Sequence, residues 1–170
     1  DLYRSKSGNY DCIVPGSGGK DSFYAAHILK YKYGMHPLTV TWSPHLYTDW
    51  GRRNFDRWLS AGFDNVLITP NPQIHRFLTR LAVENLFHPF QPFIIGQKSL
   101  AAKMSVLHKI PLVFYGEDEA EYGNPKSLSS KRDNSFHSVA EKIHLGGVSI
   151  EDLKSKYLLT DSDLSPYLPL

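Results

Sequence analysis

Short apolar runs alternate with longer amphipathic stretches along residues 10–115, and turn-forming residues separate them. Short apolar runs between turn signals are typical of buried β-strands. They predict strands at Tyr10–Pro15, Pro37–Trp42, Phe63–Thr69, Pro92–Ile95 and Ile110–Tyr115. Apolar residues at helical spacing predict helices over Asp21–Tyr33, from the N-cap Thr48 or Asp49 to Ser60, over Pro72–Phe87 and over Lys98–Lys109.

Strands and helices alternate in this order, which is typical of a parallel sheet with helices on both faces. The expected fold class is α/β, a three-layer sandwich with a five-stranded parallel sheet. Ligands of such sheets bind beyond the carboxyl ends of the strands. The segments expected at that edge are 16–22, Trp42–Tyr47, Gly96–Lys98 and Gly116–Tyr122.

The character of the chain changes after Gly123. Residues 124–135 are polar and poor in apolar side chains, which predicts a loop or linker after a core domain of residues 1–123. We expect residues 136–170 to form a helical C-terminal segment of the same domain. It would contain a short helix over Phe136–Leu145 and another that begins after the N-cap Ser149.

Composition and charge exclude several classes of function. The 170 residues, 41% hydrophobic and 21% charged, fit one globular domain. A net charge of +2 predicts no bulk attraction to nucleic acid, and no apolar stretch is long enough for membrane insertion. The chain has no signal-peptide pattern, so we expect a cytoplasmic protein. It begins at Asp1 without an initiator methionine and ends abruptly at Pro-Leu, so we expect a piece of a longer product. A single cysteine, Cys12 in an apolar strand, excludes an internal disulfide and is expected to be buried.

A glycine-rich segment, Gly16–Ser22, joins the first predicted strand to the first predicted helix. Glycines let a backbone approach a ligand closely, and the N–H groups at a helix start attract anions. The segment is neither a Walker loop nor a dinucleotide fingerprint. A Walker loop requires Gly and Ser/Thr where this chain has Val14 and Asp21, and the fingerprint requires a glycine in place of Asp21. We therefore expect a phosphate-binding loop of another kind, with a turn that holds no ligand as the alternative.

The hexapeptide Ser17–Ser22 (SGGKDS) resembles the SGGxDS signature of the PP-loop, or N-type, ATP pyrophosphatases. That superfamily includes GMP synthetase, asparagine synthetase, argininosuccinate synthetase and tRNA-thiolating enzymes. The resemblance implies an adenine nucleotide alpha hydrolase-like fold, ATP as substrate and Mg²⁺ on its phosphates. It also implies that ATP is cleaved to AMP and pyrophosphate: a substrate carbonyl oxygen attacks the α-phosphate, and a nitrogen or sulfur nucleophile then displaces AMP.

A longer resemblance extends over residues 10–123. The runs VTWSPHLYTDWGRRN, FDNVLITPNPQIHRFLTRLA, PFQPFIIGQKS and IPLVFYGEDEAEYG are similar to the N-acetyl sugar amidotransferases of bacterial lipopolysaccharide and surface-polysaccharide biosynthesis. This implies that nitrogen replaces the amide oxygen of a sugar or sugar-nucleotide substrate and gives an acetamidino sugar. A separate glutaminase subunit is implied as the source of ammonia. Gly16 stands where the family usually has a larger residue.

The site residues follow from this resemblance together with the predicted strand ends. The implied catalytic residues are Ser17, Lys20, Asp21 and Glu117, and Asp21 and Glu117 are also the implied metal ligands. The implied nucleotide-binding residues are Ser17, Gly18, Gly19, Lys20, Asp21, Ser22, Thr41, Trp42, Gly96, Gln97, Lys98 and Gly116.

Several of these residues have a second interpretation. Lys20, at the variable position of the signature, either contacts phosphate or points to solvent. Glu117 is either a ligand or part of a solvated acidic turn, and Trp42 either lies near the adenine or belongs to the core. Arg52 and Arg53, near a helix start, either meet an anionic partner such as a diphosphate or carboxylate, or form a solvated face.

Two other functions remain open at this point. A PP-loop enzyme that modifies tRNA by thiolation or lysidine-type ligation would use the same activation of a substrate. Thiolation typically needs more cysteines than Cys12, and RNA binding favours a basic stripe. The other alternative is a nucleotide-binding module without catalysis, which the complete SGGKDS signature disfavours.

Overall fold

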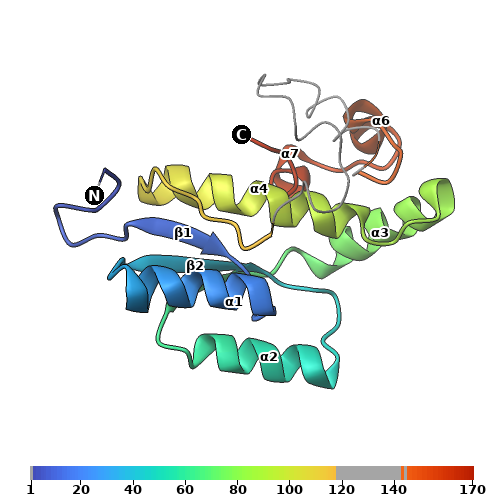
Figure 1. Ribbon diagram of the computed structural model, residues 1–170. Coiled ribbons are helices and arrows are strands. Elements are labelled where there is room, and N and C mark those ends of the chain that lie inside the picture. Colours follow the sequence, from blue (N-terminus) through green and yellow to red (C-terminus); the bar gives the residue numbers. More distant parts are fainter. Residues whose placement is uncertain (1, 118–142, 144) are drawn as a thin grey trace. The chain divides into compact units, whose positions relative to one another are not determined.

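A computed structural model describes residues 2–117, 143 and 145–170 of the chain. Strands and helices are mixed, so the α/β class is confirmed (Figure 1). The described residues form two compact units. The first draws them from Asp1–Thr41, Tyr47–Leu67 and Met104–Asp133, and the second from Trp42–Leu46, Ile68–Lys103 and Asn134–Leu170.

A three-stranded parallel sheet carries the first unit. Its strands, in the order β1-β2-β3, are Cys12–Pro15, Pro37–Trp42 and Asp64–Ile68. Strand β1 pairs with β2 in a register that sets Cys12 opposite Pro37 and Pro15 opposite Val40. The side chains of Cys12, Ile13 and Val14 are completely buried, as the apolar run predicts.

Two helices lie on one face of this sheet (Figure 1). Helix α1 spans Lys20–His27 and continues as the π-helical turn η1 over Ile28–Lys32, and helix α2 spans Asp49–Leu59. Phe55 and Trp58 of α2 join Cys12 and Val14 of β1 in one buried apolar cluster. Burying such side chains stabilises the fold by about 1.5–3 kcal/mol each, which holds α2 against the strand that leads into the loop.

Local signals set the limits of these helices where we predicted them. Thr48 is the N-cap of α2, and its hydroxyl accepts a hydrogen bond of 3.0 Å from the Gly51 N–H. Gly34 follows η1 with φ +60°, a conformation that favours glycine and ends the helix. Both boundaries could be predicted because a few neighbouring residues determine them.

The predicted five-stranded sheet is wrong: three strands are present in the part of the chain that the structure describes. The expected strand Pro92–Ile95 lies inside helix α4, which runs over Gln91–His108 and also includes the expected helix Lys98–Lys109 up to its last residue. A short apolar run does not distinguish a strand from a buried helical segment. Proline is favoured in the first turn of a helix, where Pro92 lies, and good helix formers follow from Gln97 onward, in the run Gln97–Met104.

The expected strand Ile110–Tyr115 is extended but pairs only briefly. Val113 forms an isolated parallel bridge with Ile13. The Ile13 N–H donates to the Leu112 carbonyl and the Phe114 N–H donates to the Ile13 carbonyl, each at 2.8 Å. This segment therefore lies along the free edge of β1, on the side away from β2.

The second unit is helical among its described residues. Its helices are α3 (Pro72–Leu86), the Gln91–Lys103 part of α4, α6 (Ile150–Ser155) and α7 (Asp161–Leu164). Pro72 occupies the first turn of α3, as predicted, after the N-cap Asn71. Ser149 caps α6, also as predicted, through a hydrogen bond from the Asp152 N–H to its hydroxyl.

Two expectations for the C-terminal part fall outside the described residues. They are the polar segment 124–135 and most of the helix expected over Phe136–Leu145. None of the helices among the described residues is long and apolar enough to cross a membrane.

A buried histidine anchors the second unit. His75 is 2% exposed, and its Nδ1 lies 3.0 Å from the hydroxyl of Tyr167, whereas its Nε2 has no hydrogen-bond partner among the described residues. The ring of His45 stacks on it with centroids 3.8 Å apart. Burial is the main cause that lowers the pKa of His75 to about 4, and the charge of His45 adds to it. His75 is therefore neutral in the folded protein at pH 7.

This histidine should make the protein sensitive to mild acid. The pKa of His75 is lower in the folded protein than in the unfolded chain. The stability linked to neutral His75 is therefore complete above pH 6.5 and is lost as the pH falls toward 4. We expect wild type to lose about 2 kcal/mol of unfolding free energy between pH 7.5 and pH 5 because of this group. Urea titrations should show a smaller loss in His75→Phe, and an unchanged loss in His27→Asn, which removes an exposed histidine. Equal losses in wild type and His75→Phe would contradict the assignment.

Candidate functional site

The glycine-rich segment forms the turn from β1 into α1, as predicted. Gly19 is the N-cap of α1, with an extended backbone and no side chain capping the helix. The N–H groups of Lys20, Asp21 and Ser22 therefore occupy the first helical positions, where the helix itself offers no acceptor. With the positive end of the helix dipole beside them, these groups form a site suited to an anion.

Glycine is required at three positions around this turn because other atoms lie too close for a side chain. A Cβ at Gly18, whose φ is +91°, would lie 2.4 Å from the carbonyl oxygen of Asn54 on α2. A Cβ at Gly16 would lie 2.6 Å from Ser22, and one at Gly116 would lie 2.5 Å from the Ser22 nitrogen. The turn is thus packed against α2 on one side and against Gly116 on another.

Gly19 differs, because it has open space around it. The nearest atom that a Cβ there would meet is the Ser22 hydroxyl oxygen, at 3.9 Å. Both Gly19 and Ser17 are exposed. A phosphate can therefore approach the backbone at Gly19, whereas protein atoms already occupy the space beside Gly16 and Gly18.

The polar side chains of the loop have different environments. The Ser22 hydroxyl donates to the Gly19 carbonyl at 3.1 Å, so its proton is used within the first turn of α1. Lys20 is 90% exposed and its Nζ lies 3.8 Å from a carboxylate oxygen of Asp21, which is half exposed. Ser17, Lys20 and Asp21 can all be reached by a ligand from solvent.

A chain of partly buried hydrogen bonds holds the start of the loop. The Thr41 hydroxyl, at the end of β2, donates to the Gly16 carbonyl at 2.6 Å. The side-chain amide of Asn65, on β3, donates to the hydroxyls of Thr39 and Thr41 at 2.9 and 3.0 Å. Thr41 was expected near the nucleotide, and the structure gives it a bond to the loop backbone. Sequence reasoning missed Asn65, although Asn within an apolar strand is an unusual residue and was the available signal.

The remaining predicted residues separate into two groups. Gly116 contacts the loop, and Glu117 next to it is exposed; both belong to the first unit. Trp42 belongs to the second unit with Gly96, Gln97 and Lys98.

The expected strand-to-helix junction at Gly96–Lys98 is wrong, because these residues lie inside α4. Gly96 is buried, and a Cβ there would lie 2.3 Å from the Trp42 ring. Trp42 is itself 4% exposed, which favours its interpretation as a core residue. Gln97 and Lys98 are exposed, and both lie beyond the first turn of α4, so neither stands at a helix start, where backbone N–H groups would be free.

Cys12 has the environment of a structural residue. It is completely buried in β1, and burial raises the pKa of its thiol to about 11. A nucleophilic cysteine needs an accessible thiolate. Cys12 is therefore unsuited to attack a substrate, as its position in an apolar run predicted.

The donor set for Mg²⁺ is small. Asp21 and Glu117 are both exposed carboxylates, the kind of hard oxygen ligand that Mg²⁺ prefers. Among the residues described, no group of three or more His, Cys, Asp or Glu side chains is placed to hold a metal ion. One or two carboxylates fit an ion that is held mainly by phosphate oxygens and water.

The bond from Thr41 to the loop can be tested by removing one hydroxyl. Thr41→Val keeps the shape of the side chain but leaves the Gly16 carbonyl and part of the Asn65 amide without their partner. We expect a loss of about 1–3 kcal/mol in unfolding free energy, measured by urea titration. Thr41→Ser keeps the hydroxyl and should retain most of that stability. If Thr41→Val and Thr41→Ser destabilise the protein equally, the Thr41 hydroxyl does not hold the loop.

Comparisons with known proteins add no relative to this picture. No protein-family model matches the chain, and no curated protein matches it.

Proposed function

We propose that the chain is an ATP-dependent amidotransferase of the PP-loop type, which converts the N-acetyl amide of a sugar into an acetamidino group. The observation that carries this proposal is the Ser17–Ser22 loop. It combines the SGGKDS sequence with a β-strand before it, a helix start after it and an exposed glycine backbone at Gly19. The longer sequence resemblance supplies the substrate class.

The proposed reaction has two steps. The amide oxygen of the substrate attacks the α-phosphate of ATP, and pyrophosphate leaves. Ammonia then adds to the activated amide carbon, and AMP leaves with the former amide oxygen. The protein has to stabilise the negative charge that grows on the departing pyrophosphate, which fixed N–H donors do well.

Each loop residue has a part in this proposal. The N–H groups at the start of α1 and the Ser17 hydroxyl would bind the pyrophosphate, and the charge of Lys20 would add to them. Mg²⁺ would neutralise phosphate charge, held by Asp21 and Glu117 together with water. The packing of Gly18 and Gly116 keeps the loop in place before ATP arrives, so little reorganisation is needed during the reaction.

The nitrogen must come from outside this chain. Cys12 is the only thiol in the sequence, and it is buried with a raised pKa. Glutamine hydrolysis requires a thiolate beside a base, which Cys12 does not provide. A glutaminase subunit that delivers ammonia therefore belongs to the proposal.

The loop assignment can be tested with two variants. Ser17→Ala and Asp21→Ala should each lower pyrophosphate release from ATP at least tenfold, measured with ammonium and a panel of N-acetylated sugars and nucleotide-linked sugars. Both residues are exposed, so the melting temperature should change little. Ser60→Ala, at the end of α2, is the matched control. Wild-type turnover in either loop variant would remove the loop from the reaction.

The nitrogen source gives a second test. AMP formation should occur with ammonium and be absent with glutamine alone, and a cognate glutaminase should restore the use of glutamine. Cys12→Ser should lower the unfolding free energy, because it buries a hydroxyl in an apolar strand, while turnover with ammonium persists. Glutamine-dependent activity of this polypeptide alone would contradict the proposal. Loss of ammonium turnover in a folded Cys12→Ser would instead favour sulfur transfer.

A further inference from the structure

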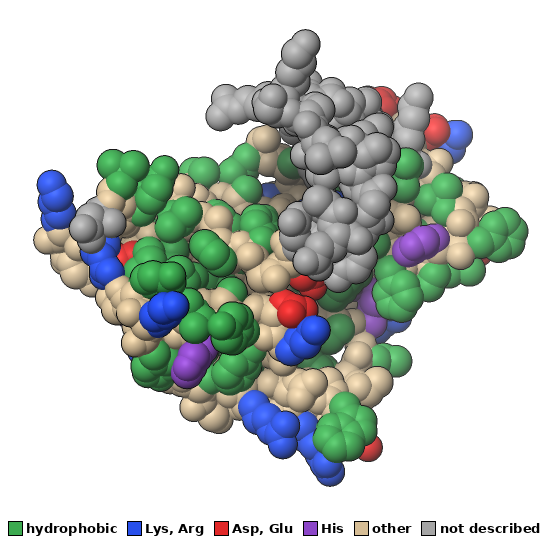
Figure 2. Space-filling view, in the orientation of Figure 1, with side chains coloured by type: hydrophobic (Ala, Val, Ile, Leu, Met, Phe, Trp, Pro, Cys, Tyr) green, Lys and Arg blue, Asp and Glu red, His purple; other side chains and the backbone are tan. Residues whose placement is uncertain are grey.

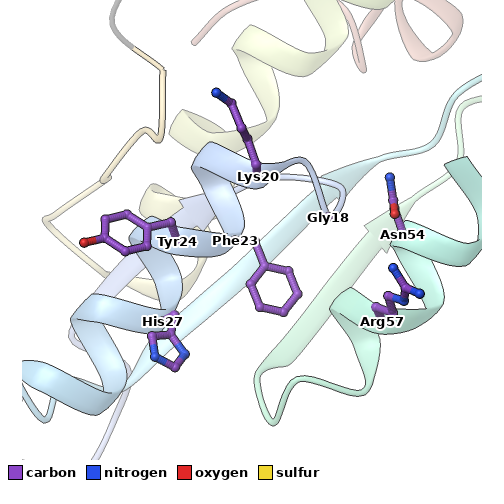
Figure 3. Close-up of a pocket in the computed structure, with 7 residues that line it drawn as sticks. All are labelled: Gly18, Lys20, Phe23, Tyr24, His27, Asn54 and Arg57. Atoms are coloured by element: carbon purple, nitrogen blue, oxygen red, sulfur yellow. The ribbon is translucent and has the colours of Figure 1, made fainter. Parts of the chain in front are cut away.

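A cavity of about 420 Å³ opens between α1 and α2 in the first unit, beside the glycine loop. Figure 3 shows Phe23 of α1 on one side of it and Asn54 and Arg57 of α2 on the other, with Gly18 between the two helices. Lys20 and His27 also line it, and none of the lining residues that the structure describes is Asp or Glu. The cavity is larger than a single phosphate group requires.

Arg57 is the cation that α2 contributes to the lining of this cavity. The side chain of Lys20 also reaches the lining, but it extends in the opposite direction from Phe23 (Figure 3). In the part of the chain that the structure describes, Arg57 has no ion pair and the side chain of Asn54 has no hydrogen bond. A guanidinium group without a carboxylate and an amide without a partner, three positions apart on one helix, present several free N–H donors on the same side.

The other two arginines of α2 are engaged elsewhere. Arg52 pairs with Asp56 at 3.1 Å, and Arg53 lies over the ring of Trp50 at 5.1 Å. Basic side chains are visible together over α2 on the molecular surface (Figure 2). Arg57 is therefore the one arginine of this helix that lines the cavity. Its charge is the same as that of Arg52 and Arg53, so its position is what distinguishes it.

The cavity is also coupled to the loop by packing. A Cβ at Gly18 would overlap the carbonyl of Asn54, so the loop and this part of α2 are in direct contact. Arg57 follows one helical turn later, on the same side of α2. A ligand in the cavity would thus lie next to the loop that we propose for ATP, in contact with Phe23 as an apolar wall.

We infer that this cavity binds the phosphoryl group of a second ligand, distinct from ATP, through Arg57 and Asn54. The planar guanidinium donates two parallel hydrogen bonds to phosphate oxygens, and the Asn54 amide donates another. The remaining volume, next to Phe23, accommodates the ring of a phosphorylated sugar. The evidence for a site is the cavity and its lining. We further take the phosphorylated sugar to be the amide-bearing substrate of the reaction, and this assignment rests on the proposed function.

Direct binding tests this inference without any turnover. Titration calorimetry with N-acetylglucosamine 1-phosphate, N-acetylglucosamine and inorganic phosphate would compare wild type with Arg57→Gln and Arg53→Gln. The two variants remove the same charge from the same helix. We expect Arg57→Gln to weaken binding of the sugar phosphate at least tenfold and Arg53→Gln to change it less than twofold, while the uncharged sugar does not bind. Tighter binding of the sugar phosphate than of inorganic phosphate identifies a phosphorylated sugar as the ligand, and equal binding identifies free phosphate.

A loop variant separates this site from the ATP site. Ser17→Ala should retain binding of the sugar phosphate even though it loses ATP cleavage. Equal weakening by Arg57→Gln and Arg53→Gln, no binding of either phosphate compound at millimolar concentration, or loss of binding in Ser17→Ala would each overturn the inference. If ATP is not cleaved but binding depends on Arg57, the cavity site stands and the proposed function falls.

Discussion

The turn from β1 into α1 is packed so closely that no side chain fits at Gly16, Gly18 or Gly116. The contacts lie on two sides of the turn: Gly18 lies against the carbonyl of Asn54, and Gly116 lies against the backbone of Ser22. Trp58 of α2 is buried behind the same turn and joins the core around β1. The phosphate-binding role that we propose for this turn requires a backbone that is ordered before its ligand arrives, and close packing favours such order. Lys20 and Asp21, which follow this closely packed turn, have exposed side chains.

The parts of the fold that a few neighbouring residues determine could be predicted from the sequence. Thr48, Pro72 and Ser149 each mark a helix start correctly, because a cap or a first-turn proline acts on the next one to three residues. The strand expected at Pro92–Ile95 could not be resolved in this way. Whether so short an apolar run is helical depends on what it packs against, and Gly96 in fact packs against the Trp42 ring.

In the candidate site, too, some features follow from neighbouring residues in the sequence and others depend on packing. The loop and its place between a strand and a helix follow from the order of residues, so Gly18, Gly19 and Asp21 lie where the sequence predicted. The environment of Arg57 did not follow, because three arginines of one helix look alike in a sequence. Only packing shows that Asp56 engages Arg52, that Trp50 engages Arg53 and that Arg57 faces a cavity.

In the hydrogen-bond chain of Thr39, Thr41 and Asn65, the donors determine which way round the Asn65 amide lies. The hydroxyl of Thr39 donates to the Asp64 carbonyl at 2.8 Å, and that of Thr41 donates to the Gly16 carbonyl at 2.6 Å. Each hydroxyl has then used its only proton, so it can only accept from Asn65. The amide of Asn65 must present its nitrogen to both, and its buried oxygen then has no partner within the part of the chain that the structure describes. An unsatisfied buried acceptor costs about 1–3 kcal/mol, so this arrangement of β2 and β3 carries a stability cost while it fixes the first carbonyl of the loop.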